Sequence, residues 1–240
     1  MVKKISIVIP ARDEHETIGM VLSEISSVTK SMSNYLWEII VVTDHCVDKT
    51  AQIAKKCGAS ILDNPYDVGK GNALRAGFLE ARGDIIIMMD ADYSHKAEDI
   101  KQLIKPLSQQ DVGLVIGSRS LGGSGEYTVI RTLGNIFLTF FVNLLFHLRL
   151  TDSLNGYKAF KRSILKYNPL SGSSFEIEIE LIYNTLLGDK RIIEIPSYER
   201  VRAGGTMKSH AIIDGFRFFI CILKNGIRYN SKRLFSFRLF

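Results

Sequence analysis

The feature that most constrains the fold is the regular alternation of short apolar runs with helical segments in the first half of the chain. Mostly aliphatic runs that predict β-strands lie at residues 5–9, 37–42, 59–62, 85–89 and 112–116. Segments with helical spacing or helix-end signals lie between or beside them, at residues 15–29, 48–57, 71–81 and 97–108. Strands that alternate with helices of this length form βαβ units. The sequence therefore predicts an α/β fold with a mostly parallel sheet flanked by helices.

The chain has 240 residues, of which 46% are hydrophobic, so it can bury a substantial core. We expect one α/β domain over residues 1–210 and a C-terminal extension, amphipathic and basic, over residues 211–240. The formal net charge of +6 favours polyanionic partners such as nucleotide phosphates or an anionic membrane surface. Nucleic acid is also a polyanion, but the sequence has no nucleic-acid-binding motif. We therefore expect no nucleic-acid partner.

Two carboxylates, Asp90 and Asp92, follow the buried run 85–89 with only Ala91 between them. An unpaired buried carboxylate is very costly, so each acid needs a partner or solvent. Mg²⁺ and Mn²⁺ take oxygen ligands and commonly use one or two carboxylates together with substrate phosphates. Ligands of open α/β sheets bind beyond the carboxyl ends of the strands, which is where these acids lie. The pair predicts a divalent metal site, with a solvated surface turn as the alternative.

Four loops should meet at this edge of the sheet: residues 10–14, 43–50, 69–73 and 90–92. Asp44 follows a strand and can accept hydrogen bonds from a base or a ribose, whereas Asp48 suits the cap of the next helix. Gly69 and Gly71 would let a phosphate approach a helix start, with charge supplied by Lys70. The chain has no G-x-G-x-x-G after the first strand and no Walker A motif. These loops therefore predict a nucleotide-binding site that differs from both the Rossmann dinucleotide site and the P-loop.

Taken together, these motifs resemble those of the family 2 glycosyltransferases. The similar elements are Ile-Val-Ile-Pro-x-x-x-Glu at residues 7–14, D-x-x-x-D-x-T at 44–50, G-K-G-x-A-x-x-x-G at 69–77 and D-A-D at 90–92. Within the family the chain looks most like the polyprenyl-phosphate sugar transferases. The supporting downstream elements are Gly117-Ser118-Arg119, Arg131, Asp152-x-x-x-Gly156-Tyr157 and Arg202-x-x-Gly205-x-x-Lys208. The resemblance covers about residues 4–223.

The resemblance implies a GT-A fold, a nucleotide-sugar donor, a polyprenyl phosphate acceptor and Mg²⁺ or Mn²⁺ as cofactor. It places the donor nucleotide on Pro10, Ala11, Arg12, Glu14, Asp44, Lys70, Asp90 and Ala91, with the metal on Asp90 and Asp92. It places the acceptor phosphate on Ser118, Arg119, Arg131, Arg202 and Lys208, and the catalytic set is Asp90, Asp92, Arg119, Arg131 and Arg202. Two departures stand out. Tyr93, Ser94 and His95 occupy the stretch where many relatives have a glutamine, and Met207 stands where relatives often have serine before the lysine.

A phosphate acceptor is already an anion near neutral pH, so the implied reaction needs no general base and is expected to be a single inverting displacement. Arg119 directly follows a strand, and Arg131 is expected in a Gly- and Thr-rich loop. A transferase that acts on a sugar hydroxyl is the alternative, and it would need a base such as Asp152 or Glu176. A sugar-nucleotide pyrophosphorylase would want a Gly-rich basic first loop, and the acid-rich residues 10–14 are the reverse. A non-catalytic nucleotide- or metal-binding module is the last alternative.

Two apolar stretches raise the question of a membrane. Residues 136–150 are apolar nearly all round, but 15 helical residues reach only about 22 Å, short of a hydrocarbon core of ~30 Å. They predict a buried helix or a helix lying in the membrane interface. Residues 211–223 are also apolar, and residues 224–240 carry basic and aromatic but no acidic side chains. We expect peripheral attachment to the cytoplasmic face of a membrane, without a signal peptide or a full transmembrane span.

Overall fold

The computed structural model describes residues 3–126, 128–205 and 211–237. Its sheet has the strand order β3-β2-β1-β4-β6-β5-β7, and β6 runs antiparallel to its neighbours β4 and β5 while the other pairs are parallel. The strands are β1 (Lys3–Ala11), β2 (Tyr35–Thr43), β3 (Ser60–Asp63), β4 (Ile85–Met88), β5 (Val112–Ser118), β6 (Lys158–Lys161) and β7 (Arg191–Pro196). The predicted α/β architecture and its five strands are confirmed.

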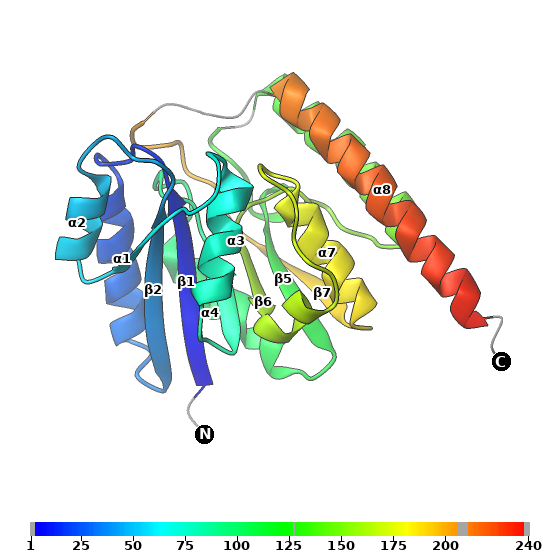
Figure 1. Cartoon of the computed structure of the whole chain (residues 1–240), viewed down its shortest axis with the longest axis horizontal. Helices are drawn as coiled ribbons and strands as arrows, with labels where there is room; N and C mark the ends of the chain where they lie inside the picture. The colour runs from blue at the N-terminus through cyan, green and yellow to red at the C-terminus, as the bar shows by residue number, and fades with distance from the viewer. Residues whose placement is uncertain (1–2, 127, 206–210, 238–240) are drawn as a thin grey trace.

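Helices cover both faces of the sheet, as Figure 1 shows. They are α1 (Ile18–Lys30), α2 (Thr50–Lys56), α3 (Lys70–Glu80), α4 (Ile100–Ile104), α5 (Arg119–Gly122), α6 (Val129–Phe146), α7 (Ile177–Leu187) and α8 (Ala211–Phe237). Successive side chains of a strand point to opposite faces. Ile5, Ile7 and Ile9 therefore pack in one core with α1, α2 and α4, while Val8 joins a second core with α3, α6, α7 and α8. Each face has its own apolar layer, which holds the carboxyl edge of the sheet in place.

Sequence patterns did not predict the last two strands. β6 is only four residues long and has a lysine at each end, a poor strand signal. Its first residue, Lys158, is fully buried because the ammonium donates to the carbonyls of Ser153 and Asn155. β7 lies at the edge of the sheet, and only Ile195 of its six residues is buried. Tertiary pairing, rather than an apolar run, specifies both strands.

Helix α6 corrects the expected boundaries of the apolar helix. It begins at Val129, so Arg131 lies in its first turn and not in a loop. It ends at His147, which adopts the left-handed conformation with φ of 57°, and the Asn143 side chain closes the turn through two hydrogen bonds to the backbone of Leu150. With 18 residues, the helix is long and apolar enough to cross a bilayer. This differs from the expectation that the chain has no segment of that length and composition. Length and composition alone do not make it a span, since core helices of soluble proteins have both.

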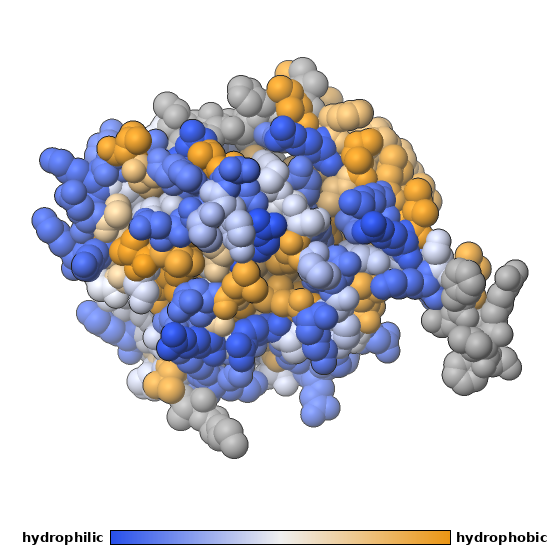
Figure 2. Space-filling model, viewed as in Figure 1, coloured by the Kyte–Doolittle hydropathy of each residue, from blue (hydrophilic) through white to orange (hydrophobic). Residues whose placement is uncertain are grey.

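Helix α8 packs against α6 and α7 and places Phe218, Cys221 and Ile222 in the second core. The outer sides of α6 and α8 expose large apolar residues, which we call the apolar helix face: Val129, Ile130, Leu133, Ile136, Phe137, Phe140, Leu144, Ile213, Phe216, Ile220, Ile227 and Leu234. Figure 2 shows hydrophobic residues gathered along α8 at the right of the molecule. Contiguous apolar patches of this kind mark interaction surfaces.

Candidate active site

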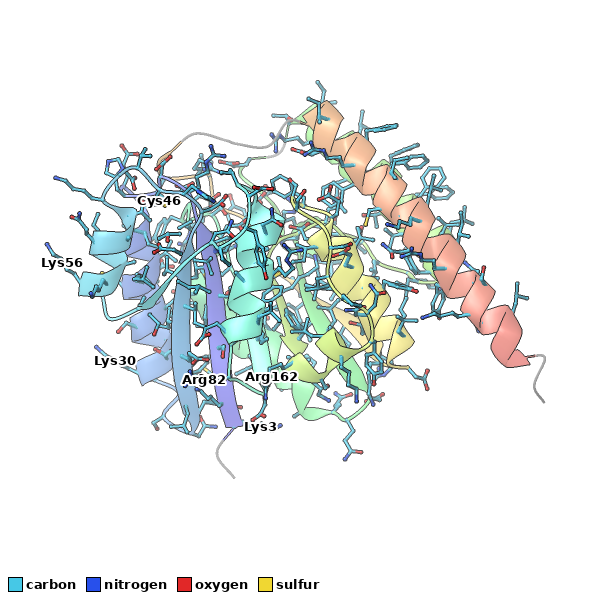
Figure 3. The ribbon with its side chains drawn as sticks, in the orientation of Figure 1. Lys3, Lys30, Cys46, Lys56, Arg82 and Arg162 are labelled. Carbon is cyan, nitrogen blue, oxygen red and sulfur yellow. The ribbon has the colours of Figure 1, made fainter. Side chains whose placement is uncertain are left out.

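A cleft of about 500 Å³ opens at the carboxyl edge of the sheet, between the strand ends and helices α6 and α8. Twelve of the predicted site residues line it: Pro10, Ala11, Arg12, Glu14, Asp44, Lys70, Asp90, Ala91, Asp92, Arg119, Arg131 and Arg202. Figure 3 shows Cys46 at this edge and Lys3, Arg82 and Arg162 at the opposite end of the molecule. The loops predicted to meet at one edge of the sheet therefore do so.

The two aspartates after β4 each contact a basic side chain of the protein. The Asp90 carboxylate lies 2.8 Å from the Lys70 ammonium, and the Asp92 carboxylate lies 2.8 Å from the Arg202 guanidinium. The other Asp92 oxygen accepts hydrogen bonds from the backbone N–H and the hydroxyl of Ser94, at 3.0 and 2.6 Å. The pair thus lines the cleft with both carboxylates in a defined orientation.

The contact between Asp90 and Lys70 keeps both of these side chains charged. Burial alone would raise the pKa of Asp90, but the nearby Lys70 ammonium lowers this pKa to about 2. Burial alone would lower the pKa of Lys70, and the carboxylates of Asp90 and Glu178 instead raise it well above its usual value. Near neutral pH the site therefore presents an ionised carboxylate and an ammonium side by side.

The chemistry of the cleft fits a divalent cation. Among the described residues that line it, eight are acidic and five are basic, and this excess of carboxylates disfavours a free polyanion unless a cation comes with it. Carboxylate oxygens are ligands that Mg²⁺ and Mn²⁺ prefer. Neither Tyr93 nor His95 replaces the glutamine of relatives: the Tyr93 hydroxyl donates to Glu24, and His95 accepts from the Asp90 backbone N–H while stacking on Tyr157. Asp90 and Asp92 thus remain the candidate metal ligands.

The glycine loop before α3 corrects the predicted phosphate cradle. The backbone N–H groups of Gly71 and Asn72, at the helix start, donate to the carbonyl of Ser173. A Cβ atom at Gly71 would lie 2.4 Å from the carbonyl oxygens of Gly172 and Ser174. Glycine is required here because another loop of the protein packs on the helix start, and the helix N–H groups are not open to phosphate.

Two acids of the predicted nucleotide loops have structural partners. The Asp44 carboxylate accepts from the Asn64 side chain at 2.7 Å and from the Gly69 backbone N–H at 3.0 Å, which ties β2 to the glycine loop. Asp48 was predicted to cap α2, but Lys49 is the N-cap residue; Asp48 lies one residue earlier and accepts from the Thr50 backbone N–H at 2.8 Å. Asp13, Cys46 and Asp48 also cluster within 4.8 Å, and the first and last of them accept backbone hydrogen bonds that join the first two loops.

The predicted phosphate-binding residues divide into three groups. Arg119 lines the cleft, and the buried Asp152 holds its guanidinium with bonds of 2.7 and 2.9 Å. Arg131 and Arg202 line the same cleft. Ser118 does not: its hydroxyl is fully buried against Thr151 and caps α5, so its predicted contact with phosphate is wrong for this structure. Lys208 lies outside the described residues.

Sequence reasoning missed four acidic side chains that line the cleft: Glu126, Glu178, Glu199 and Asp214. Of the bases proposed for a hydroxyl acceptor, Asp152 is occupied by Arg119, and Glu176 accepts the Ser174 backbone N–H and does not line the cleft. Glu178, in the first turn of α7, lines it instead. Acids are favoured in the first turn of a helix, but in the alternating run of residues 175–180 no pattern distinguishes a buried glutamate from an exposed one.

Comparisons with known proteins show the family of the chain. The model of the family "Glycosyl transferase family 2" matches residues 6–167. The chain is 26% identical to an undecaprenyl-phosphate mannosyltransferase of Micrococcus luteus, over 92% of this chain and 96% of that protein. It is 30% identical to a dolichyl-phosphate beta-glucosyltransferase of Trichomonas vaginalis, over 68% of this chain and 54% of that protein. The chain thus spans about half the length of several curated relatives.

The fold also matches solved structures. Glucosyl-3-phosphoglycerate synthase of Mycobacterium tuberculosis, in complex with Mn²⁺, UDP-glucose and phosphoglyceric acid, is 24% identical and has a TM-score of 0.75 over 93% of this chain and 80% of that one. This similarity confirms the expected GT-A arrangement of the sheet and helices. Since the family model covers more than half of its residues, the chain belongs to glycosyltransferase family 2.

Proposed function

We propose that this enzyme transfers a sugar from a nucleotide sugar to a polyprenyl phosphate, with inversion and with Mg²⁺ or Mn²⁺, at the cytoplasmic face of a membrane. The observation that carries the proposal is the composition of the cleft. Acids, a lysine and arginines line it together with apolar residues of α6 and α8. The acids with the lysine suit a metal-bound diphosphate, and the arginines with the apolar residues suit an anionic head group with an apolar chain.

The donor side is formed by the first loops of the sheet. The nucleoside would be held by Pro10, Ala11, Arg12, Glu14, Asp44 and Ala91. The divalent ion would be held by Asp90 and Asp92. Such an ion, when bound, stabilises negative charge on a departing diphosphate. Lys70 adds an ammonium beside the same group. The excess of acidic over basic residues in the cleft supports a donor whose diphosphate binds together with a divalent cation.

The acceptor side combines charge with apolar surface. Arg119, Arg131 and Arg202 line the cleft together with Ile130 and Phe218. A guanidinium fork matches phosphate oxygens in two places, and apolar side chains suit an isoprenoid chain. Both relatives described above are named for polyprenyl phosphates, which supports this class of acceptor.

The reaction follows from these positions. An acceptor phosphate oxygen attacks the anomeric carbon of the donor sugar, the bond from that carbon to the diphosphate oxygen breaks, and the nucleoside diphosphate leaves. The arginines align the attacking oxygen, and alignment of this kind accounts for a large part of the rate of such displacements. No proton has to be removed from the acceptor, so no general base is required. One displacement inverts the configuration at the anomeric carbon.

The test is a panel of radiolabelled UDP-glucose and GDP-mannose offered with undecaprenyl or dolichyl phosphate, with Mg²⁺, with Mn²⁺ and with chelator. We expect label to move into the organic phase only when a divalent ion is present, and the product to have the opposite anomeric configuration to the donor. Label that stays in water-soluble saccharide would instead favour a hydroxyl acceptor, for which Glu178 would be the available base.

The apolar helix face is expected to bind anionic vesicles. Changing Phe216 and Ile220, which are 65% and 47% exposed, to aspartate should weaken binding by at least about tenfold, because burial of one large apolar side chain contributes ~1.5–3 kcal/mol. Flotation with liposomes measures this. Leu79→Asp on α3, at a 73% exposed position outside the face, is the matched control and should float like the unaltered chain. Equal flotation of all variants would argue against this surface.

A further inference from the structure

We propose that Glu178 receives a hydroxyl of the sugar being transferred and that the floor of the cleft beside Gly156 is the subsite for that sugar. The proposal rests on the proposed function only for the class of donor. Glu178 lies in the first turn of α7, lines the cleft and is 1% exposed. None of the roles assigned above to metal, nucleoside or acceptor phosphate uses this carboxylate.

The bonding of Glu178 is incomplete. One carboxylate oxygen lies 3.6 Å from the Lys70 ammonium, and the other, Oε2, has no hydrogen-bond partner within the described part of the chain. Burial raises the pKa of Glu178, although Lys70 opposes this effect. A buried acceptor without a donor destabilises the fold. The glutamate next but one, Glu180, shows the contrast: it is also buried, and its carboxylate accepts bonds from Ser171 and Gly172.

Gly156 allows charged side chains to approach the backbone closely at this point of the cleft. A Cβ atom there would lie 2.9 Å from the Lys70 ammonium, 3.1 Å from an Asp90 oxygen and 3.4 Å from a Glu178 oxygen. Three charged groups thus converge on a stretch of backbone that has no side chain. Because Asp90 is a candidate ligand for the ion on the diphosphate, a group beside Gly156 is close to the diphosphate end of the donor, where the sugar is attached.

Two neighbours make this floor suitable for a sugar. Phe175 also lines the cleft, with its ring centroid 5.1 Å from the Lys70 ammonium, and it adds an apolar wall next to the carboxylate. Lys70 covers Glu178 in the present structure by standing between two carboxylates. An anionic diphosphate attracts this ammonium away from Glu178. The carboxylate then needs another donor, which a sugar hydroxyl supplies.

The experiment compares binding of nucleotide with binding of nucleotide sugar, without acceptor. Affinities of the intact chain for UDP, UDP-glucose, GDP and GDP-mannose are measured by calorimetry with Mn²⁺ and repeated with Glu178→Ala and Glu178→Gln. We expect Glu178→Ala to lose about 10- to 100-fold in affinity for the sugar nucleotide that the chain binds, since a hydrogen bond to a charged group is lost. Its affinity for the nucleoside diphosphate should stay within about twofold, because that ligand has no sugar. The glutamine variant should lose less, since an amide oxygen still accepts.

Asp99→Asn is the matched control: burial also raises the pKa of Asp99, and this acid lies outside the cleft. It should leave all affinities unchanged, and circular dichroism checks that each variant is folded. Unchanged affinity of Glu178→Ala for the sugar nucleotide would overturn the proposal, as would an equal loss for the nucleoside diphosphate. Normal donor binding by Glu178→Gln with abolished turnover would also overturn it and would make Glu178 a general base. Failure of transfer to polyprenyl phosphate leaves these binding results intact, so the two proposals fail separately.

Discussion

Asp92→Asn is expected to lower the rate of sugar transfer by about 10³-fold, on the scale seen when one electrostatic contact to a transition state is removed. The asparagine oxygen can still accept the two bonds from Ser94, so the turn should keep its shape. What the variant loses is the charge that pairs with Arg202 and that would hold a divalent ion. The effect therefore falls on catalysis rather than on folding.

The measurement is transfer of label at saturating donor over a series of Mn²⁺ concentrations, with thermal unfolding of each variant. Asp111→Asn is the control, because Asp111 is exposed at the start of β5 in an ion pair with Arg191, and its loss should change neither rate nor stability appreciably. A rate for Asp92→Asn within tenfold of the unaltered chain, or full activity in chelator, would contradict a metal site at this pair.

The largest effect on stability is expected for Asp152→Asn. The Asp152 carboxylate has no exposed surface, and it holds Arg119 through the side chain and the backbone N–H. Breaking a buried ion pair by removing one partner costs about 3–5 kcal/mol of unfolding free energy. Because Arg119 would also lose its orientation in the cleft, we expect the rate of transfer to fall together with stability.

The pH dependence of this pair has a definite sign. Burial alone would raise the pKa of Asp152, but Arg119 lowers it below the ordinary value of 3.8. The stabilisation is therefore present above pH 3.8 and is lost as the pH falls through the lower folded value. Urea unfolding should show the full difference between the unaltered chain and Asp152→Asn at pH 7, with a smaller difference below pH 3.8. A difference that does not change with pH would contradict this assignment.

A double-mutant cycle separates the pair from its surroundings. Arg119→Met, Asp152→Asn and the double variant should show a coupling energy of more than about 1 kcal/mol, because the two side chains contact each other directly. The stability of Arg119→Lys should lie between that of the unaltered chain and that of Arg119→Met, because lysine keeps the positive charge but lacks the two-pronged guanidinium. Additive effects would mean that Asp152 stabilises the fold without Arg119.

Local patterns were sufficient for most of the sheet and for the position of Asp90 and Asp92. The apolar run before Asp90 is a strand because its side chains fit both cores, and the acids follow where the strand ends. The same argument placed Asp44 at the end of β2. In contrast, β6 depends on a buried lysine whose partners are backbone carbonyls, and no periodic pattern reveals such a contact.

The site shows the same division. The resemblance to the family predicted that Arg119, Arg131 and Arg202 hold one phosphate, and all three line the same cleft. Neither the motifs nor the resemblance could reveal that Asp152 holds Arg119 or that the Ser118 hydroxyl contacts Thr151. Both pairs join residues 33 positions apart in the chain, and burial selects each partner.

By itself the sequence determined the α/β class, the family and the strand-end acids, because these follow from periodicity and from short motifs that act locally. Only the tertiary structure decided that the glycine loop is closed by Ser173, that α6 begins early enough to include Arg131, and that Glu178 is buried in the cleft. The physical reason is desolvation: whether a polar group is free, paired or buried depends on neighbours brought together by the whole fold.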